Sequence, residues 1–132
     1  MNVLLDTQAL IWALTDSDNL TAKARSWIQE ADTVYVSPIN FYETAIKVAI
    51  GRDTGIQWPI QRIIQEALLS NFTWLPLSGR HIEAYTQLPF YENHRDPFDR
   101  IILAMALSDD LAVISSDHNF PRYNHLIRIL WE

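Results

Sequence analysis

The chain of 132 residues contains no cysteine, which excludes disulfides, thiolate nucleophiles and zinc sites built on thiolates. Its three glycines, at positions 51, 55 and 79, form neither a phosphate-binding glycine loop nor a glycine-flanked serine. No apolar run approaches the roughly 20 residues that a membrane-spanning helix needs. These absences exclude several common enzyme classes and give no sign of a membrane protein.

Positive charge is also scarce. Ten Lys and Arg residues stand against sixteen Asp and Glu residues, so the net charge is −6, which argues against binding nucleic acid through a broad basic surface. This balance still allows a nuclease, because cations held by clustered carboxylates would change the charge that a substrate meets. Without a basic leader or a small-residue cleavage site at the start, we expect no signal peptide and a cytoplasmic protein.

Short apolar segments alternate with segments of helical periodicity along the whole chain. Strands are expected at 2–6, 34–36, 73–77, 111–115 and 126–130. Helices are expected through 9–13, 22–31, 38–50, 59–68, 78–86 and 97–108. Continuously apolar strands separated by helices are typical of an α/β fold whose parallel sheet is covered on both faces. Since no linker or repeat divides the chain, we predict one domain over residues 1–132: three α/β/α layers around a short central parallel sheet of four to five strands.

Several carboxylates follow expected strands or lie near the start of expected helices: Asp6, Glu43, Asp96, Asp99 and Asp117. Parallel sheets place their sites at the carboxyl ends of strands, near a topological switch point, so residues that follow different strands can meet at one rim. A cluster of like charges needs neutralisation, and carboxylate oxygens suit Mg²⁺ or Mn²⁺ better than zinc. The pattern therefore predicts an acidic site for Mg²⁺, with Mn²⁺ as a substitute.

Each of these acids also has a structural explanation. Asp6 would cap the following helix, and Asp117 would form a turn. Glu43 interrupts an apolar stripe made by Ile39, Ile46 and Ile50, and a buried carboxylate of this kind should bind metal or else pair with Lys47 one turn on.

The start of the last helix separates two acids that lie close in sequence. Asp96 precedes Pro97 and reads as the N-cap. Asp99 then lies in the first helical turn, where the helix dipole stabilises a rigid, ionised carboxylate. We therefore prefer Asp99 as the metal ligand and place Asp96 behind it, as cap or substitute.

Four segments stand in order along the chain: LLDTQALIWAL, VSPINFYETAIKVAIGR, HRDPFDRIILAMAL and LAVISSDHNFPRY. Taken in order, they resemble PIN-domain ribonucleases, in particular toxins of the VapC type, and the resemblance runs over nearly the whole chain. The resemblance implies a PIN-like fold, RNA cleavage that depends on Mg²⁺ or Mn²⁺, a homodimer and a small antitoxin that blocks the cleft. It assigns the catalytic, metal-binding quartet to Asp6, Glu43, Asp99 and Asp117.

Other residues are expected to support that site. Thr7 and Ser115 carry hydroxyl groups beside the first and last acids. Arg95, Arg100 and His118 are the candidates for holding RNA phosphates. The histidines at 81, 94, 118 and 125 fall in polar segments and are expected to meet phosphate or solvent rather than metal.

Two rival functions are weighed against the nuclease. A phosphatase resembling haloacid dehalogenases would need a second Asp two residues after Asp6, where Gln8 stands. A PIN-fold protein that binds or processes RNA outside toxin–antitoxin biology, with or without catalysis, would retain the same acids.

Overall fold

The computed structural model describes every residue from Met1 to Glu132 and contains a five-stranded sheet in the order β3–β2–β1–β4–β5. The strands are β1 (Asn2–Leu5), β2 (Thr33–Val36), β3 (Thr73–Trp74), β4 (Ala112–Ile114) and β5 (Ile129–Leu130). All pairings between neighbouring strands are parallel. The predicted α/β class with a parallel sheet is confirmed.

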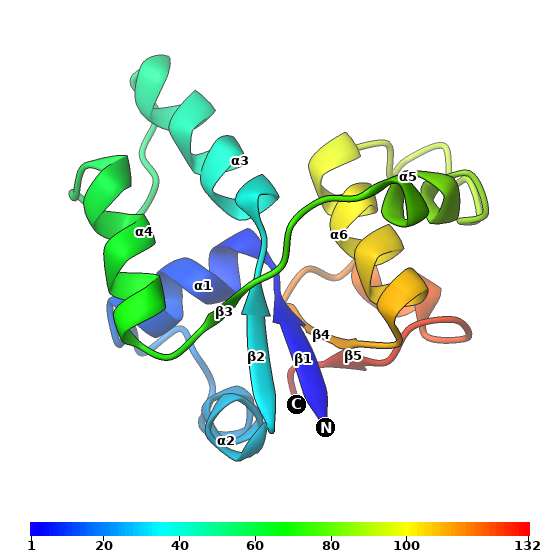
Figure 1. Cartoon of the computed structure of the whole chain (residues 1–132), viewed down its shortest axis with the longest axis horizontal. Helices are drawn as coiled ribbons and strands as arrows, with labels where there is room; N and C mark the ends of the chain where they lie inside the picture. Colours follow the sequence, from blue (N-terminus) through cyan, green and yellow to red (C-terminus); the bar gives the residue numbers. More distant parts are fainter.

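Helices lie on both faces of this sheet. They are α1 (Thr7–Leu14), α2 (Ala22–Glu30), α3 (Pro38–Ala49), α4 (Ile60–Leu69), α5 (Gly79–Tyr85) and α6 (Pro97–Asp109), with a short 3₁₀ helix η1 at Phe120–Tyr123. Figure 1 shows α1 and α4 on one side of β1 and β2, and α5 and α6 on the other. None of the helices combines the length and apolar character needed to cross a bilayer.

The central strand β1 explains how two cores form. Val3 and Leu5 join the core formed with α1, α2, α3 and α4, whereas Leu4 points to the opposite face and joins the core formed with α5, α6 and η1. All three side chains are fully buried. A strand buried on both faces must be apolar at successive positions. Asp6 is the first residue after β1, where the chain leaves the sheet and turns into α1.

Helix caps fix where several functional elements begin. Asp6 accepts a hydrogen bond from the Ala9 N–H at the start of α1, and Asp96 accepts hydrogen bonds from the Phe98 and Asp99 N–H groups at the start of α6. Ser37 caps α3 by accepting from the Ile39 N–H. Such caps stabilise a helix by about 1 kcal/mol each. The structural readings of Asp6 and Asp96 are therefore correct, and both carboxylates are held at helix N-termini.

The two edge strands are shorter than predicted, ending up as residues 73–74 and 129–130 rather than 73–77 and 126–130. Pro76 has no N–H with which to continue the β3 ladder. Leu126 and Ile127 instead donate their N–H groups to the Tyr123 carbonyl, which closes a turn after η1. Apolar character alone did not reveal these local interruptions.

Candidate functional site

The predicted acids meet in one pocket at the carboxyl ends of β1 and β4. Its lining includes Asp6, Glu43, Asp96, Asp99 and Asp117 and contains no hydrophobic residue. The chain runs from β1 to β2 on one side and from the neighbouring β4 to β5 on the other. The gap between β1 and β4 is therefore the switch point at which open α/β sheets hold ligands. The pocket measures about 400 Å³, a volume typical of small-ligand sites.

Three of these carboxylates lie closest together. One oxygen from each of Glu43, Asp96 and Asp99 lies within 4.8 Å of the others. Glu43 comes from α3, and the other two come from the N-terminus of α6. Asp96 therefore caps α6 and also lines the pocket as an exposed residue beside Glu43 and Asp99, closer to the proposed ligands than its sequence context indicates.

Asp6 is the most buried acid of the pocket, with 8 % of its surface exposed. Burial raises the pKa of its carboxyl from 3.8 to about 7. Hydrogen bonds from Ser115 and from the Ala9 N–H lower this pKa, whereas the charges of Asp99 and Asp117 raise it. Asp6 is thus a helix cap whose pKa is also raised by the charges of other acids in the pocket.

The pKa of Asp99 is shifted in the same direction and also mainly by burial. Burial raises its pKa to about 6, a hydrogen bond from His94 lowers it, and the neighbouring charges of Asp96 and Asp117 raise it. Like charges held this close disfavour full ionisation unless a cation is present. A set of mainly carboxylate oxygens at this spacing fits a hard divalent cation such as Mg²⁺ or Mn²⁺.

A family model described as PIN domain matches residues 3–126, a range that contains all five acids. The chain belongs to the PIN domain family. A comparison with curated proteins finds no match.

Solved structures of similar fold include three with toxin–antitoxin names. VapBC2 from Rickettsia felis, bound to a fragment of promoter DNA, matches with a TM-score of 0.71 and 16 % identity over 100 % of both chains. VapBC-5 from Mycobacterium tuberculosis has a TM-score of 0.62 and 18 % identity over 98 % of this chain and 95 % of its own. A toxin–antitoxin complex from Klebsiella pneumoniae has a TM-score of 0.63 and 21 % identity over 97 % and 95 %. At these identities the likeness concerns the fold.

Helix α3 of this PIN domain presents a different face to the core than predicted. Its buried residues are Asn40, Phe41 and Thr44, whereas Ile50 is 63 % exposed and Glu43 is half-buried at the pocket. Ile39 packs half-buried against the core formed with α5, α6 and η1, so only part of the apolar stripe around Glu43 faces a core. The helix is apolar on several sides, so periodicity could not select the buried one.

The alternative ion pair between Glu43 and Lys47 does not form, because the Lys47 nitrogen lies more than 4.0 Å from both carboxylate oxygens of Glu43. Lys47 instead lines the acidic pocket, where it is the only Lys or Arg residue. The sequence signal for a pocket position of Lys47 is its place one helical turn after Glu43. This spacing puts the two side chains on the same face of the helix and does not require them to form an ion pair.

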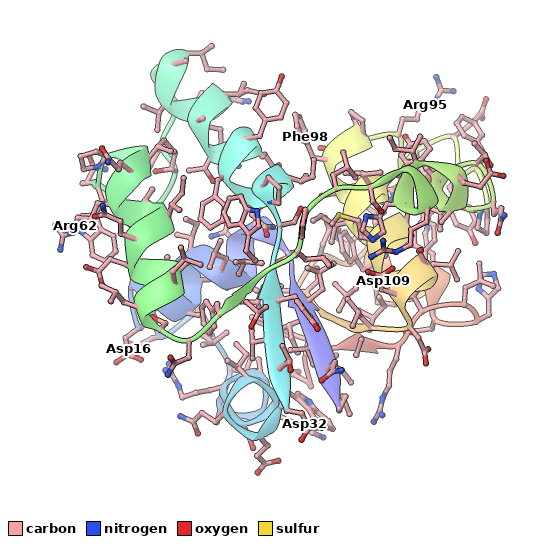
Figure 2. All side chains as sticks on the ribbon, in the orientation of Figure 1. Asp16, Asp32, Arg62, Arg95, Phe98 and Asp109 are labelled. Carbon is pink, nitrogen blue, oxygen red and sulfur yellow. The ribbon has the colours of Figure 1, made fainter.

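The three predicted phosphate contacts have different positions. His118 lines the pocket. Arg95 does not line it; the side chain is exposed, lies over the Phe90 ring and extends from the surface (Figure 2). The prediction for Arg100 is wrong, because its guanidinium is buried and donates to the Pro89 carbonyl and the Tyr123 hydroxyl.

The two supporting hydroxyl residues lie beside the acids as expected. Ser115 is buried and its Oγ accepts the Asp117 N–H, while Asp117 in turn accepts the Asn119 N–H in a tight turn. Thr7 lines the pocket, and its Oγ1 accepts a hydrogen bond from Asn40. The proposed turn role of Asp117 is thus real, and it coexists with a place in the pocket.

Sequence reasoning missed two buried polar groups that support this region. The Asn40 amide donates to the Leu5 carbonyl at the end of β1, which ties α3 to the strand that carries Asp6. His94 is 4 % exposed and bonds Asp99, so the expectation of a solvent-facing histidine is wrong there. It is also wrong for His81, which is fully buried and bonds Asp109.

Proposed function

We propose that this PIN domain is an endoribonuclease that depends on Mg²⁺ or Mn²⁺. The observation that carries this proposal is a pocket that five carboxylates line and to which no hydrophobic residue contributes. Glu43 and Asp99 would hold the ion, with Asp6 and Asp117 completing the quartet and Asp96 close enough to contribute. When bound, the ion would lower the pKa of a water molecule and neutralise the negative charge that develops on the leaving oxygen.

The reaction that suits this pocket is hydrolysis of an RNA phosphodiester. Water adds to phosphorus in line with the 3′ oxygen, the bond to that oxygen breaks, and the products carry a 5′-phosphate and a 3′-hydroxyl. The carboxylates that line the pocket repel a phosphate group unless a cation accompanies it. The protein must therefore place positively charged side chains near the RNA backbone. Lys47 and His118, which line the same pocket, would hold the backbone phosphates.

We further propose that the protein is the cytoplasmic toxin of a toxin–antitoxin pair, forms a homodimer and is inhibited by a small antitoxin. Support comes from similar folds named as VapBC and toxin–antitoxin complexes, which the chain matches over nearly its whole length. A neighbouring short gene for a DNA-binding protein, whose product copurifies with this chain and stops RNA cleavage, would establish the partner.

The nuclease activity is tested with purified protein and labelled RNA, both single-stranded and structured. We expect cleavage in Mg²⁺ or Mn²⁺ and none in EDTA, because the acids alone repel the substrate. Calorimetric titration with Mn²⁺ in the absence of RNA gives an independent measure of the site. If no RNA is cut and no Mn²⁺ binds, the proposed function is wrong and a PIN-fold binding module is the better description.

Replacing Lys47 by Ala should weaken RNA binding and reduce the slope of log affinity against log salt by about one, as loss of one phosphate contact does. Lys47→Arg should retain most of the affinity. Lys23, the other lysine of the chain, is exposed on α2 and absent from the pocket lining, so Lys23→Ala is the matched control. Filter binding in Ca²⁺ over a salt series measures both quantities, and equal slopes for the two alanine variants would exclude this role.

A further inference from the structure

We propose that His94 is a positioning residue of the acidic pocket: it holds Asp99 through a hydrogen bond, and Tyr123 and Arg100 hold the His94 ring in place. The inference rests on the proposed function insofar as Asp99 is taken as a metal ligand. His94 does not line the pocket itself, so its effect on the ion would pass through the Asp99 carboxylate.

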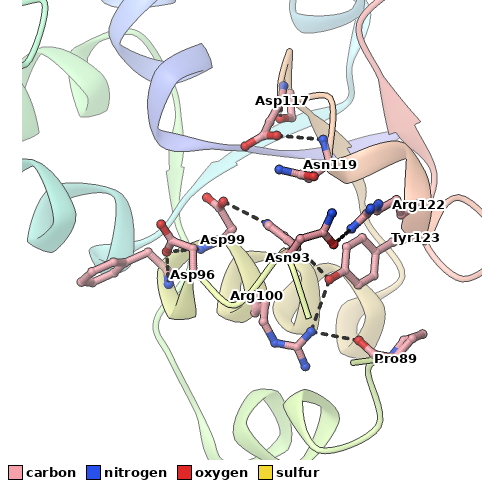
Figure 3. A network of polar contacts seen from close by, with 12 residues as sticks. Pro89, Asn93, Asp96, Asp99, Arg100, Asp117, Asn119, Arg122 and Tyr123 are labelled. Carbon is pink, nitrogen blue, oxygen red and sulfur yellow. Dashed lines mark hydrogen bonds and ion pairs between the residues drawn. The ribbon is translucent and has the colours of Figure 1, made fainter. Parts of the chain in front are cut away.

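A continuous line of hydrogen bonds connects these four residues. His94 Nε2 lies 3.1 Å from Asp99 Oδ2, and His94 Nδ1 lies 2.9 Å from the Tyr123 hydroxyl oxygen. Arg100 Nη1 lies 3.3 Å from that same hydroxyl oxygen. His94, Tyr123 and Arg100 are all buried. Figure 3 shows the line running from Arg100 through Tyr123 toward Asp99.

The chemistry of the partners gives each bond of the neutral His94 ring a direction. The ionised Asp99 carboxylate can only accept, so Nε2 of the neutral ring carries the proton and donates it. Nδ1 is then unprotonated and accepts the Tyr123 O–H. A guanidinium can only donate, so the Tyr123 oxygen accepts from Arg100 while its O–H remains free to donate. The same tautomer therefore satisfies both ends of the line.

The far end of the line is held rigidly. Arg100 Nη1 also donates to the Pro89 carbonyl at 2.9 Å, Nε donates to the Tyr85 hydroxyl at 3.3 Å, and the guanidinium stacks over the Tyr85 ring. A flipped His94 ring would set carbon atoms against Tyr123 and Asp99 and would leave buried polar groups without partners.

Fixing one oxygen of Asp99 leaves the other for the pocket. His94 occupies Oδ2, and no hydrogen bond of the chain engages Oδ1. The bond to His94 fixes the orientation of the Asp99 carboxylate, one oxygen of which lies within 4.8 Å of an oxygen of Glu43 and an oxygen of Asp96. Partners of this kind, one step removed from a metal, typically change metal affinity or activity by about 10- to 100-fold.

The tautomer is tested directly by two-bond ¹⁵N–¹H NMR of the histidine rings in the full chain without metal. We expect a pyridine-type signal for Nδ1 of His94 and a pyrrole-type signal for Nε2. Tyr123→Phe removes the donor to Nδ1 and should shift the Nδ1 signal, while the bond to Asp99 keeps Nε2 protonated. A wild-type ring protonated on Nδ1, or on both nitrogens at neutral pH, would overturn the inference whether or not the protein cuts RNA.

The positioning role is tested by Mn²⁺ affinity, measured by calorimetry. His94→Leu should weaken Mn²⁺ binding by about 10- to 100-fold, and His94→Gln, which retains an N–H donor, should recover part of the loss. His81→Leu is the matched control, because His81 is equally buried and its Nε2 lies 3.0 Å from Asp109, which does not line the pocket. It should lower stability without changing Mn²⁺ affinity.

The outcomes separate this inference from the proposed function. If wild type binds Mn²⁺ and His94→Leu binds it no more weakly than His81→Leu, the positioning role is overturned while the metal site stands. If wild type itself binds no Mn²⁺, the proposed function fails, and the NMR result still decides the direction of the hydrogen bonds.

Discussion

Asp99→Asn is expected to reduce metal-dependent RNA cleavage by more than about 100-fold. Loss of a partner one step removed from a metal typically costs about 10- to 100-fold, and Asp99 is here a proposed direct ligand. The amide is similar in size and still accepts the His94 hydrogen bond through its oxygen, so the surrounding network of Figure 3 should persist. The change removes a charge from the pocket with little change in shape. Single-turnover cleavage of labelled RNA in Mg²⁺ measures the effect.

Asp110→Asn is the matched control for this experiment. Asp110 is the C-cap residue after α6 and has a φ of 55°, a conformation that Asn tolerates well, and it does not line the acidic pocket. Its cleavage rate should equal that of wild type. Asp99→Asn cleaving as fast as Asp110→Asn, with metal bound equally well, would remove Asp99 from the proposed ligand set.

The same cleavage experiment on a variant of Asp96 tests whether this residue is one of the metal ligands. Asn caps helices as well as Asp does, so Asp96→Asn should keep α6 intact while removing the charge from the group that includes Glu43 and Asp99. A loss comparable to that of Asp99→Asn would make Asp96 a ligand. A cleavage rate close to that of wild type would mean that Asp96 serves only as the N-cap of α6, as its sequence context indicates.

The parts of the fold that sequence predicted well are those with local causes. Ser37 followed by Pro38 and Asp96 followed by Pro97 determine helix starts through their own hydrogen bonds and φ preferences. The apolar run of β1 requires a strand buried on both faces. Once β1 and β4 are parallel neighbours, the residues that follow them share a rim, so the convergence of Asp6 and Asp117 follows from topology alone.

The errors concern side chains whose burial depends on distant segments. Arg100 and His94 stand in a polar motif, and nothing within that motif shows that η1 brings Tyr123 into contact with both. Asp109 precedes Asp110 at the end of α6, a polar context typical of a solvated turn, yet it bonds Arg80 and His81 from α5, and the Arg80 guanidinium holds its pKa well below the usual range. Charged residues in one sequence segment can therefore face solvent, a partner or a site, depending on the element that packs over them.

In the absence of metal, the protein is expected to lose stability as the pH rises from about 4 to about 7. Burial raises the pKa of Asp6 from 3.8 to about 7, so between these values the folded state holds a proton that the unfolded chain has released. Stability then falls with rising pH. The contribution is complete below the unfolded pKa and is lost as the pH passes through the folded one. A displacement of this size corresponds to about 4 kcal/mol at most.

Asp6→Asn isolates this contribution, because Asn can still cap α1 by accepting the Ala9 N–H. In EDTA at pH 8 the variant should be more stable than wild type, and the difference should shrink as the pH falls toward 4. Urea unfolding of both proteins over that range gives the comparison, in which shared contributions from other groups cancel. A wild type that is the more stable protein at pH 8 in EDTA would contradict the pKa assigned to Asp6.

Saturating Mg²⁺ should reverse the order of the two proteins at pH 8. A ligand that binds only the folded state stabilises it in proportion to the logarithm of its concentration over Kd, and wild type should gain more because it retains the buried carboxylate. RNA cleavage should fall in the variant under the same conditions. Asp6 would then reduce the stability of the metal-free protein while supporting its activity. A residue that served only as the cap of α1 would change neither the metal response nor cleavage when replaced by an equally good cap.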